Sequence, residues 1–139
     1  MKRYAAILLL IVFGCKSHNS SLVTGHITLT NNNHAIKFTG LDYAIVNEIG
    51  RDSVPGVWQT LLPVYKMPAD TDLKNYQPIQ HGTYTLKDSA VVFTPDTPFV
   101  KGKTYFMRYY QFKGENIWDY IKGKKRLGEA GYRDLVVKL

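Results

Sequence analysis

Hydrophobic and polar residues alternate along two neighbouring segments, residues 24–30 and 35–39. A period of two is typical of β-strands with one buried face. Four polar or amidic residues, 31–34, connect the segments and predict a hairpin. A slip of one residue would turn one apolar set towards solvent, which fixes the register. The predicted pairs are Leu29 with Ile36 and Ile27 with Phe38.

The same pattern predicts a second hairpin from residues 83–86 and 91–94, with its turn at residues 87–90. This register pairs Leu86 with Val91 and Tyr84 with Phe93. The longest predicted strand covers residues 104–112, and a last strand covers residues 134–139. The long strand has two predicted faces: Tyr105, Met107 and Tyr109 on one, and Phe106, Arg108 and Tyr110 on the other.

Four segments are less regular. Residues 41–49 fit a helix or a strand, and the helix is favoured because Gly50 is a common residue just past a helix end. Residues 57–65 predict a buried strand with Pro63 near its end. Residues 66–82 predict a long polar connection, and residues 114–131 a basic loop or a frayed helix.

Composition agrees with a β-rich chain of 139 residues, with 10 Tyr and recurrent turn residues. No internal repeat or second composition regime divides residues 24–139, so we expect one domain there. The sequence therefore predicts an all-β sandwich with at most a short helix near residues 42–49.

The first 14 residues have the features of a secretory signal. A basic start at residues 1–3 precedes the apolar run 4–13, which polar residues 16–19 follow. A membrane-spanning helix needs about 20 apolar residues, so this run is too short to be one. Residues 1–14 are therefore predicted to be a cleaved signal peptide.

The end of this segment resembles the lipobox of bacterial lipoproteins. Val12 and Gly14 suit that motif before Cys15, although Phe13 is bulkier than usual. Cys15 is the only Cys, which excludes an intrachain disulfide and is explained if its sulfur carries a lipid. Residues 15–23 are then the lipidated Cys and a tether. An incidental Cys after an ordinary signal peptide is the alternative.

Lipoproteins kept in the inner membrane often have Asp after the lipidated Cys, where this chain has Lys16. We therefore expect an outer-membrane protein that faces the periplasm. The formal net charge is +7, which suggests anionic neighbours such as lipid head groups. We expect the membrane as a partner through Cys15, with no nucleic-acid partner in that compartment.

Residues 91–95 (VVFTP) and 98–105 (PFVKGKTY) resemble bacterial immunoglobulin-like (Ig-like) domains. The resemblance covers residues 82–112 and the closing strand 134–139. It implies that Pro95 ends a strand and that Gly102 permits a tight turn. It also implies that Phe99 closes the bottom of a sandwich and that Tyr105 forms a tyrosine corner. The whole chain also resembles small lipoproteins of Bacteroidetes-like bacteria, a likeness that implies no activity.

Aromatic side chains are the first candidates for ligand binding. An aromatic platform for sugar rings could use Trp58, Tyr110, Trp118 and Tyr120. If Phe106, Arg108 and Tyr110 face solvent, that patch calls for a partner. If residues 114–131 fold over the patch, it is simply part of the core.

A dense basic cluster is the second candidate. Beside an anionic membrane or polysaccharide it would act as a contact surface, and otherwise it is a solvated loop. Its members are Lys122, Lys124, Lys125 and Arg126.

The remaining polar candidates are weaker. His26, His34 and His81 could handle a metal such as copper, but scattered surface His residues explain them better. Asp70 and Asp72 are too few for a calcium site and suit turns that bond their own backbone. No recognisable nucleophile, zinc or phosphate motif is present.

These observations lead to one functional expectation and two alternatives. The chain is expected to be a non-catalytic binding or structural module of the cell envelope, without a cofactor, whose ligand is a glycan or another envelope protein. A periplasmic metal-binding protein and a small hydrolase with an unrecognised carboxylate pair are the alternatives.

Overall fold

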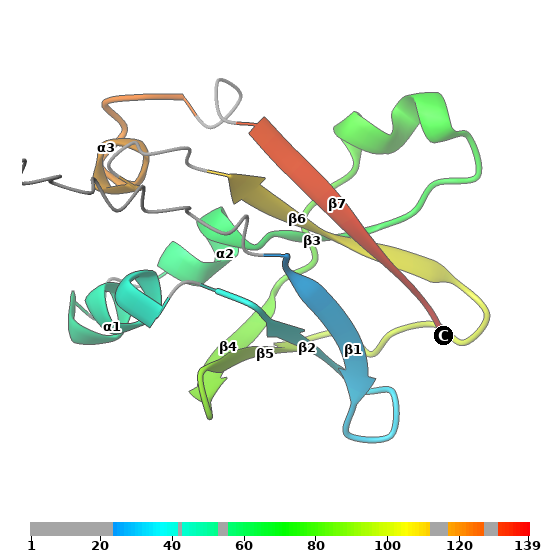
Figure 1. Cartoon of the computed structure of the whole chain (residues 1–139). Helices are drawn as coiled ribbons and strands as arrows, with labels where there is room; N and C mark the ends of the chain where they lie inside the picture. Colours follow the sequence, from blue (N-terminus) through cyan, green and yellow to red (C-terminus); the bar gives the residue numbers. More distant parts are fainter. Residues whose placement is uncertain (1–23, 42, 53–55, 112–116, 127–130) are drawn as a thin grey trace, which may run out of the picture.

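In the described part of the chain, seven β-strands form two antiparallel sheets that pack face to face (Figure 1). The computed structural model describes residues 24–41, 43–52, 56–111, 117–126 and 131–139. The first sheet has the strand order β1-β2-β5-β4 and the second β3-β6-β7. The strands are β1 (His26–Thr30), β2 (Ala35–Thr39), β3 (Val64–Lys66), β4 (Gly82–Lys87), β5 (Ala90–Pro95), β6 (Thr104–Gln111) and β7 (Gly131–Lys138).

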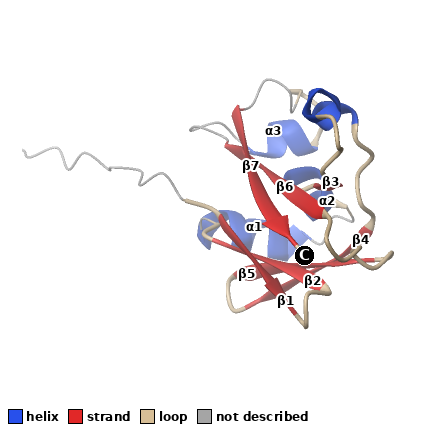
Figure 2. Ribbon diagram, turned by 90° about the vertical axis from the view of Figure 1, so that its right-hand side faces the viewer, coloured by secondary structure: helices blue, strands red, loops and turns tan. Residues whose placement is uncertain are grey.

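Short helices lie in three of the connections between strands (Figure 2). The β2–β3 connection holds α1 (Tyr43–Asp52) and α2 (Val57–Leu61), and the β6–β7 connection holds α3 (Ile117–Ile121). A 3₁₀ helix, η1 (Thr71–Tyr76), lies in the β3–β4 connection. None of the helices in the described residues is long and apolar enough to span a membrane.

Both predicted hairpin registers are confirmed. In β1–β2, Leu29 pairs with Ile36 and Ile27 with Phe38. Residues Asn31, Asn32 and Asn33 all have positive φ angles in the turn, a conformation that Asn tolerates better than most residues. In β4–β5, Leu86 pairs with Val91 and Tyr84 with Phe93.

The predicted strand at residues 57–65 is wrong over most of its length. Residues 57–61 form α2, and only Val64–Lys66 is a strand. Val57 and Leu61 are buried one helical turn apart, a spacing that a short apolar run shares with a strand. Gly56 starts the helix with a left-handed φ of 80°, and its carbonyl accepts a hydrogen bond from the Thr60 backbone.

The other irregular segments also acquire structure. The helix favoured for residues 41–49 is present as α1, which extends to Asp52. The segment 114–131 contains the one-turn helix α3, and β7 begins at Gly131 instead of residue 134. These differences lengthen the β6–β7 hairpin, because the extra residues of β7 pair with Tyr109–Gln111.

The core lies between the two sheets. The first sheet contributes Ile36, Phe38 and Phe93, and the second contributes Met107 and Leu135. Buried residues of α1 and α2 join the same cluster, so the helices close one side of the core.

The antiparallel order brings several connections to one end of the sandwich. The start of β1 faces the end of β2, and the start of β5 faces the end of β4. A Cβ placed on Gly25 would lie 3.4 Å from Cδ1 of Tyr109, near the end of β6. In Figure 1 the helices α1, α2 and α3 gather on the left and the C-terminus lies on the right. We call the left-hand end the helical end.

Candidate functional site

The outer face of the second sheet carries a cluster of aromatic and charged side chains. Alternation along β6 places Phe106, Arg108 and Tyr110 on this face, as the sequence predicts. The β-ladder pairs Tyr65 of β3 with Phe106. On the other side of β6, β7 pairs Asp134 with Arg108 and Tyr132 with Tyr110.

Arg108 is the centre of this cluster. Its Nε and one Nη atom donate hydrogen bonds to the two carboxylate oxygens of Asp134, at 2.8 and 3.0 Å. The same Nη atom donates to Oδ1 of Asn75 at 2.9 Å. The guanidinium carbon lies 4.0 Å from the ring centroid of Tyr132. Bidentate pairing and ring stacking together fix the arginine in one orientation.

Lys74 is the second cation of the cluster. Its Nζ lies 2.8 Å from Asp134 Oδ2 and 4.7 Å from the centroid of the Phe106 ring. Lys74 and Asn75 both belong to η1, so this short helix is tied to the outer face through its side chains. We call Lys74, Arg108 and Asp134 the arginine cluster.

The cluster shifts the titration of its members in opposite directions. Burial raises the pKa of Asp134, but hydrogen bonds from Arg108 and Lys74 outweigh burial and hold that pKa below its usual value. The hydrogen bond to Asp134 raises the pKa of Arg108 in spite of partial burial. Both shifts favour the charged forms of the pair.

Phe106 and Arg108 are too buried to contact a ligand directly. Phe106 is 0% exposed and Arg108 is 9% exposed. The prediction left open whether residues 114–131 cover this face, and part of that segment lies outside the described residues. The described cover comes instead from η1 and from the ring of Tyr65, which stacks on Phe106 at 5.0 Å. Phe106 and Arg108 therefore support the outer face of the second sheet from beneath.

An open groove of about 400 Å³ lies beside the cluster, between α2, β3 and the end of β6. We call it the tyrosine groove, because the rings of Tyr65 and Tyr110 are its aromatic lining. The bridge between Tyr65 and Ile79 forms one wall. The full lining is Gly56, Gln59, Thr60, Pro63, Tyr65, Ile79 and Tyr110.

The polar groups of the tyrosine groove are neutral. The Gln59 amide nitrogen lies 3.3 Å from Nδ1 of the exposed His81. Burial raises the pKa of the Tyr65 and Tyr110 hydroxyls, and the nearby Arg108 partly offsets both shifts. These hydroxyls remain protonated at neutral pH and can donate hydrogen bonds. No Asp or Glu is among the lining residues, so the groove offers no carboxylate pair for hydrolysis.

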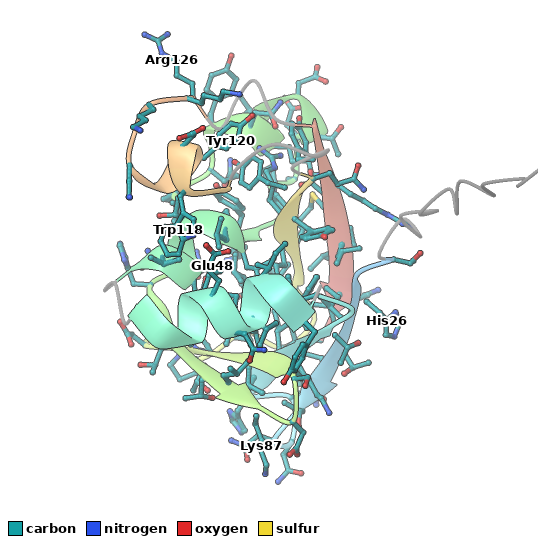
Figure 3. The ribbon with its side chains drawn as sticks, turned by 60° about the vertical axis from the view of Figure 1, so that its left-hand side comes forward. His26, Glu48, Lys87, Trp118, Tyr120 and Arg126 are labelled. Carbon is teal, nitrogen blue, oxygen red and sulfur yellow. The ribbon has the colours of Figure 1, made fainter. Side chains whose placement is uncertain are left out.

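The other aromatic candidates do not form one flat platform with Tyr110. Tyr120 is buried, and Trp58 and Trp118 are partly buried against the hydrophobic core. Trp118 donates a hydrogen bond from its ring nitrogen to Glu48 of α1 (Figure 3). Trp118 therefore joins α3 to α1, and of this group only Tyr110 lines the groove.

The predicted basic cluster forms an exposed loop directly after α3. We call residues 122–126 the basic loop. Backbone hydrogen bonds from Lys124 and Lys125 to the Asp119 carbonyl hold it, and Gly123 turns it with a φ of 71°. Lys122, Lys124, Lys125 and Arg126 are all exposed.

The metal-binding alternative gains no support from the described residues. Among them, no three His, Cys, Asp or Glu side chains come close enough together to hold a metal ion. Asp70 caps η1 and accepts a hydrogen bond from the Asp72 backbone, so the turn role expected for it is confirmed. Cys15 and the other residues of the predicted signal and tether lie outside the described residues.

The sequence pattern did not indicate the residues that complete the arginine cluster and the tyrosine groove. Lys74, Gln59 and Ile79 come from segments expected to be a loop or a strand. Asp134 is the first residue of the predicted last strand, and it could have been found by pairing that strand with residues 104–112, because this pairing places Asp134 opposite Arg108.

Comparison of the chain with models of known protein families, with curated proteins and with solved structures found no match.

Proposed function

We propose that this chain is a lipid-anchored protein of the bacterial cell envelope that binds a saccharide on an Ig-like sandwich and catalyses no reaction. Its proposed location is the outer membrane, facing the periplasm. The tyrosine groove is the observation that supports saccharide binding. Strand order supports the Ig-like fold, and the N-terminal sequence supports the anchor.

Strand order supports the Ig-like assignment. Constant-type Ig domains have strands A-B-E-D in one sheet and C-F-G in the other. Lettered along this chain, β1-β2-β5-β4 and β3-β6-β7 give the same two orders. The Tyr105 hydroxyl accepts a hydrogen bond of 3.0 Å from the Val100 backbone N–H, as a tyrosine corner at the start of strand F requires.

The anchor is supported by the sequence before the domain. A basic start, a short apolar run and the lipobox-like residues end at Cys15. Residues 15–23 are predicted from the sequence alone to be the lipidated Cys and a tether. Anchoring by two or more acyl chains is stable, because each buried methylene contributes about 0.8 kcal/mol.

The chemistry of the tyrosine groove suits a sugar ring. Aromatic rings can pack on the C–H faces of a pyranose, and the Gln59 amide and the tyrosine hydroxyls can bond its hydroxyl groups. Binding pockets for small molecules generally have volumes of about 300–1,000 Å³, and the groove is at the lower end of this range. A groove of this size fits one or two sugar residues better than a protein surface.

Saturation-transfer NMR on the purified chain tests this proposal. The probes are oligosaccharides prepared from lipopolysaccharide core and from peptidoglycan. We expect saturation to pass from tyrosine ring protons to the ring protons of at least one of these sugars. Tyr110→Ala should abolish the transfer, because it removes one aromatic wall of the groove.

Tyr76→Ala is the matched control, since Tyr76 is 81% exposed and lies on η1 outside the groove lining. It should leave the transfer unchanged. Equal transfer in the Tyr110→Ala variant, or no transfer from either sugar class, would refute the saccharide assignment.

A further inference from the structure

The basic loop lies at the same end of the molecule as the point where the described chain begins. Gly25 lies against Tyr109 near the end of β6, and α3 belongs to the connection that follows β6. The C-terminal residue lies at the other end, where the Gly102 N–H donates a hydrogen bond to the Leu139 carbonyl. A tether that precedes residue 24 therefore leaves from the helical end.

Hydrogen bonds hold the basic loop to the body of the domain. Trp118 of α3 is bonded to Glu48 of α1, and α1 in turn lies beside β4, where Gly50 approaches Leu86. Lys122 Nζ lies 6.0 Å from the Trp118 ring centroid, and Lys125 Nζ lies 5.8 Å from that of Tyr120. The loop is thus presented by a packed helix.

An acidic side chain of α3 pairs with the basic loop. Asp119 lies 3.8 Å from Lys124 Nζ, in a solvent-exposed pair. Glu48 accepts the hydrogen bond from Trp118, and no ion pair of Glu48 with a described residue is present. In Figure 3 Arg126 projects away from the ribbon. The basic loop therefore presents four exposed cations within five residues.

We infer that the basic loop is a contact surface for anionic phospholipid head groups, and that the helical end faces the membrane. The inference rests on the proposed anchor, because the tether sets which end lies near the bilayer. Lipid is favoured over a soluble polyanion, since an anchored chain keeps this end within reach of the membrane. The basic loop supplies the second, electrostatic signal that often accompanies acyl chains.

Vesicle co-sedimentation of residues 16–139 tests the inference without the anchor, because this chain lacks Cys15. The vesicles are phosphatidylcholine alone and an equal mixture of phosphatidylcholine with phosphatidylglycerol. We expect binding to the anionic vesicles that weakens as salt is added, and little binding to the neutral ones.

Two variants with the same loss of charge locate the contact. Replacing Lys122, Lys124, Lys125 and Arg126 by Gln should lower the partition coefficient at least about tenfold, because each basic residue near an anionic surface contributes about fivefold. The control removes four cations by Gln substitution at or near the opposite end. These are Lys66, Lys101, Lys103 and Lys138.

The control variant should retain most of the binding. Equal losses in the two variants would overturn the inference, because the effect would then come from net charge alone. Binding to heparin without binding to anionic vesicles would also overturn it and would assign the loop to a soluble polyanion. The tested chain carries no lipid. A failure to bind anionic vesicles would therefore overturn this inference without bearing on the lipidation of Cys15.

Discussion

Arg108 shows how a single residue can organise one face of a sheet. Alternation along β6 predicts the face of the sheet on which the Arg108 side chain lies. Its structural role depends on hydrogen bonds to Asp134 and Asn75, which come from distant segments of the chain. A buried charge is tolerated only when it is paired and hydrogen-bonded. The arginine cluster meets that condition, and it holds η1 against the sheet beside the tyrosine groove.

Asp134→Asn should lower the free energy of unfolding by about 3 kcal/mol. The substitution leaves the Arg108 and Lys74 cations without their shared carboxylate, and removing one member of a buried pair is costly. Urea unfolding at neutral pH measures the loss. Lys87→Gln is the control, because Lys87 is exposed and forms no ion pair with a described residue. A loss no larger than that of the control would contradict the structural role of the cluster.

The same carboxyl predicts a dependence on pH. Because the pKa of Asp134 is lowered in the folded protein, the unfolded chain takes up its proton first as the pH falls. The contribution of Asp134 to the free energy of unfolding is therefore fully present above its ordinary pKa of 3.8 and decreases as the pH falls below that value. Urea unfolding between pH 6 and about pH 3 should show a steeper loss in the wild type than in Asp134→Asn. Parallel curves would exclude this contribution.

The hydrogen bond of Tyr105 in the connection between β5 and β6 can be tested in the same way. Its ring is buried, and its hydroxyl accepts the Val100 N–H. Tyr105→Phe should reduce the free energy of unfolding by about 1 kcal/mol, because the amide loses its partner. The exposed Tyr76→Phe substitution should have no measurable effect. Equal unfolding midpoints for the two variants would argue against a tyrosine corner.

At the scale of elements, the hairpins could be predicted because their registers depend on local alternation and short turns. The segment 57–65 could not, because Val57, Leu61 and Val64 fit a strand as well as a helix followed by a strand. Packing against the core decides between them. The tyrosine groove was missed for the same reason, since α2 supplies part of its lining.

The turn between β5 and β6 depends on Gly102, which has a φ of 77°. Gly102→Ala should cost about 1 kcal/mol, because a side chain disfavours the left-handed conformation. Gly131→Ala is a matched control: a Cβ there meets nothing within 4 Å either, and the residue is not among those with positive φ. Thermal unfolding compares the two. A Gly102→Ala variant as stable as Gly131→Ala would show that the turn does not require glycine.

At the scale of the whole molecule, the basic loop and the C-terminus lie at opposite ends of the sandwich. The tyrosine groove lies on the outer face of the second sheet, and its lining from α2 and the end of β6 places it towards the helical end. The sequence predicts the anchor and the sandwich. The positions of the groove and the basic loop could not be predicted, because they depend on how connections far apart in the sequence pack together.

The anchor is the central claim, and the mass of the N-terminal peptide of the protein purified from its envelope tests it most directly. We predict a peptide that begins at Cys15 and carries a diacylglyceryl group on its sulfur, and that Cys15→Ser yields no lipidated peptide. A wild-type peptide that begins at Met1, or that contains Cys15 with a free thiol, would contradict the account.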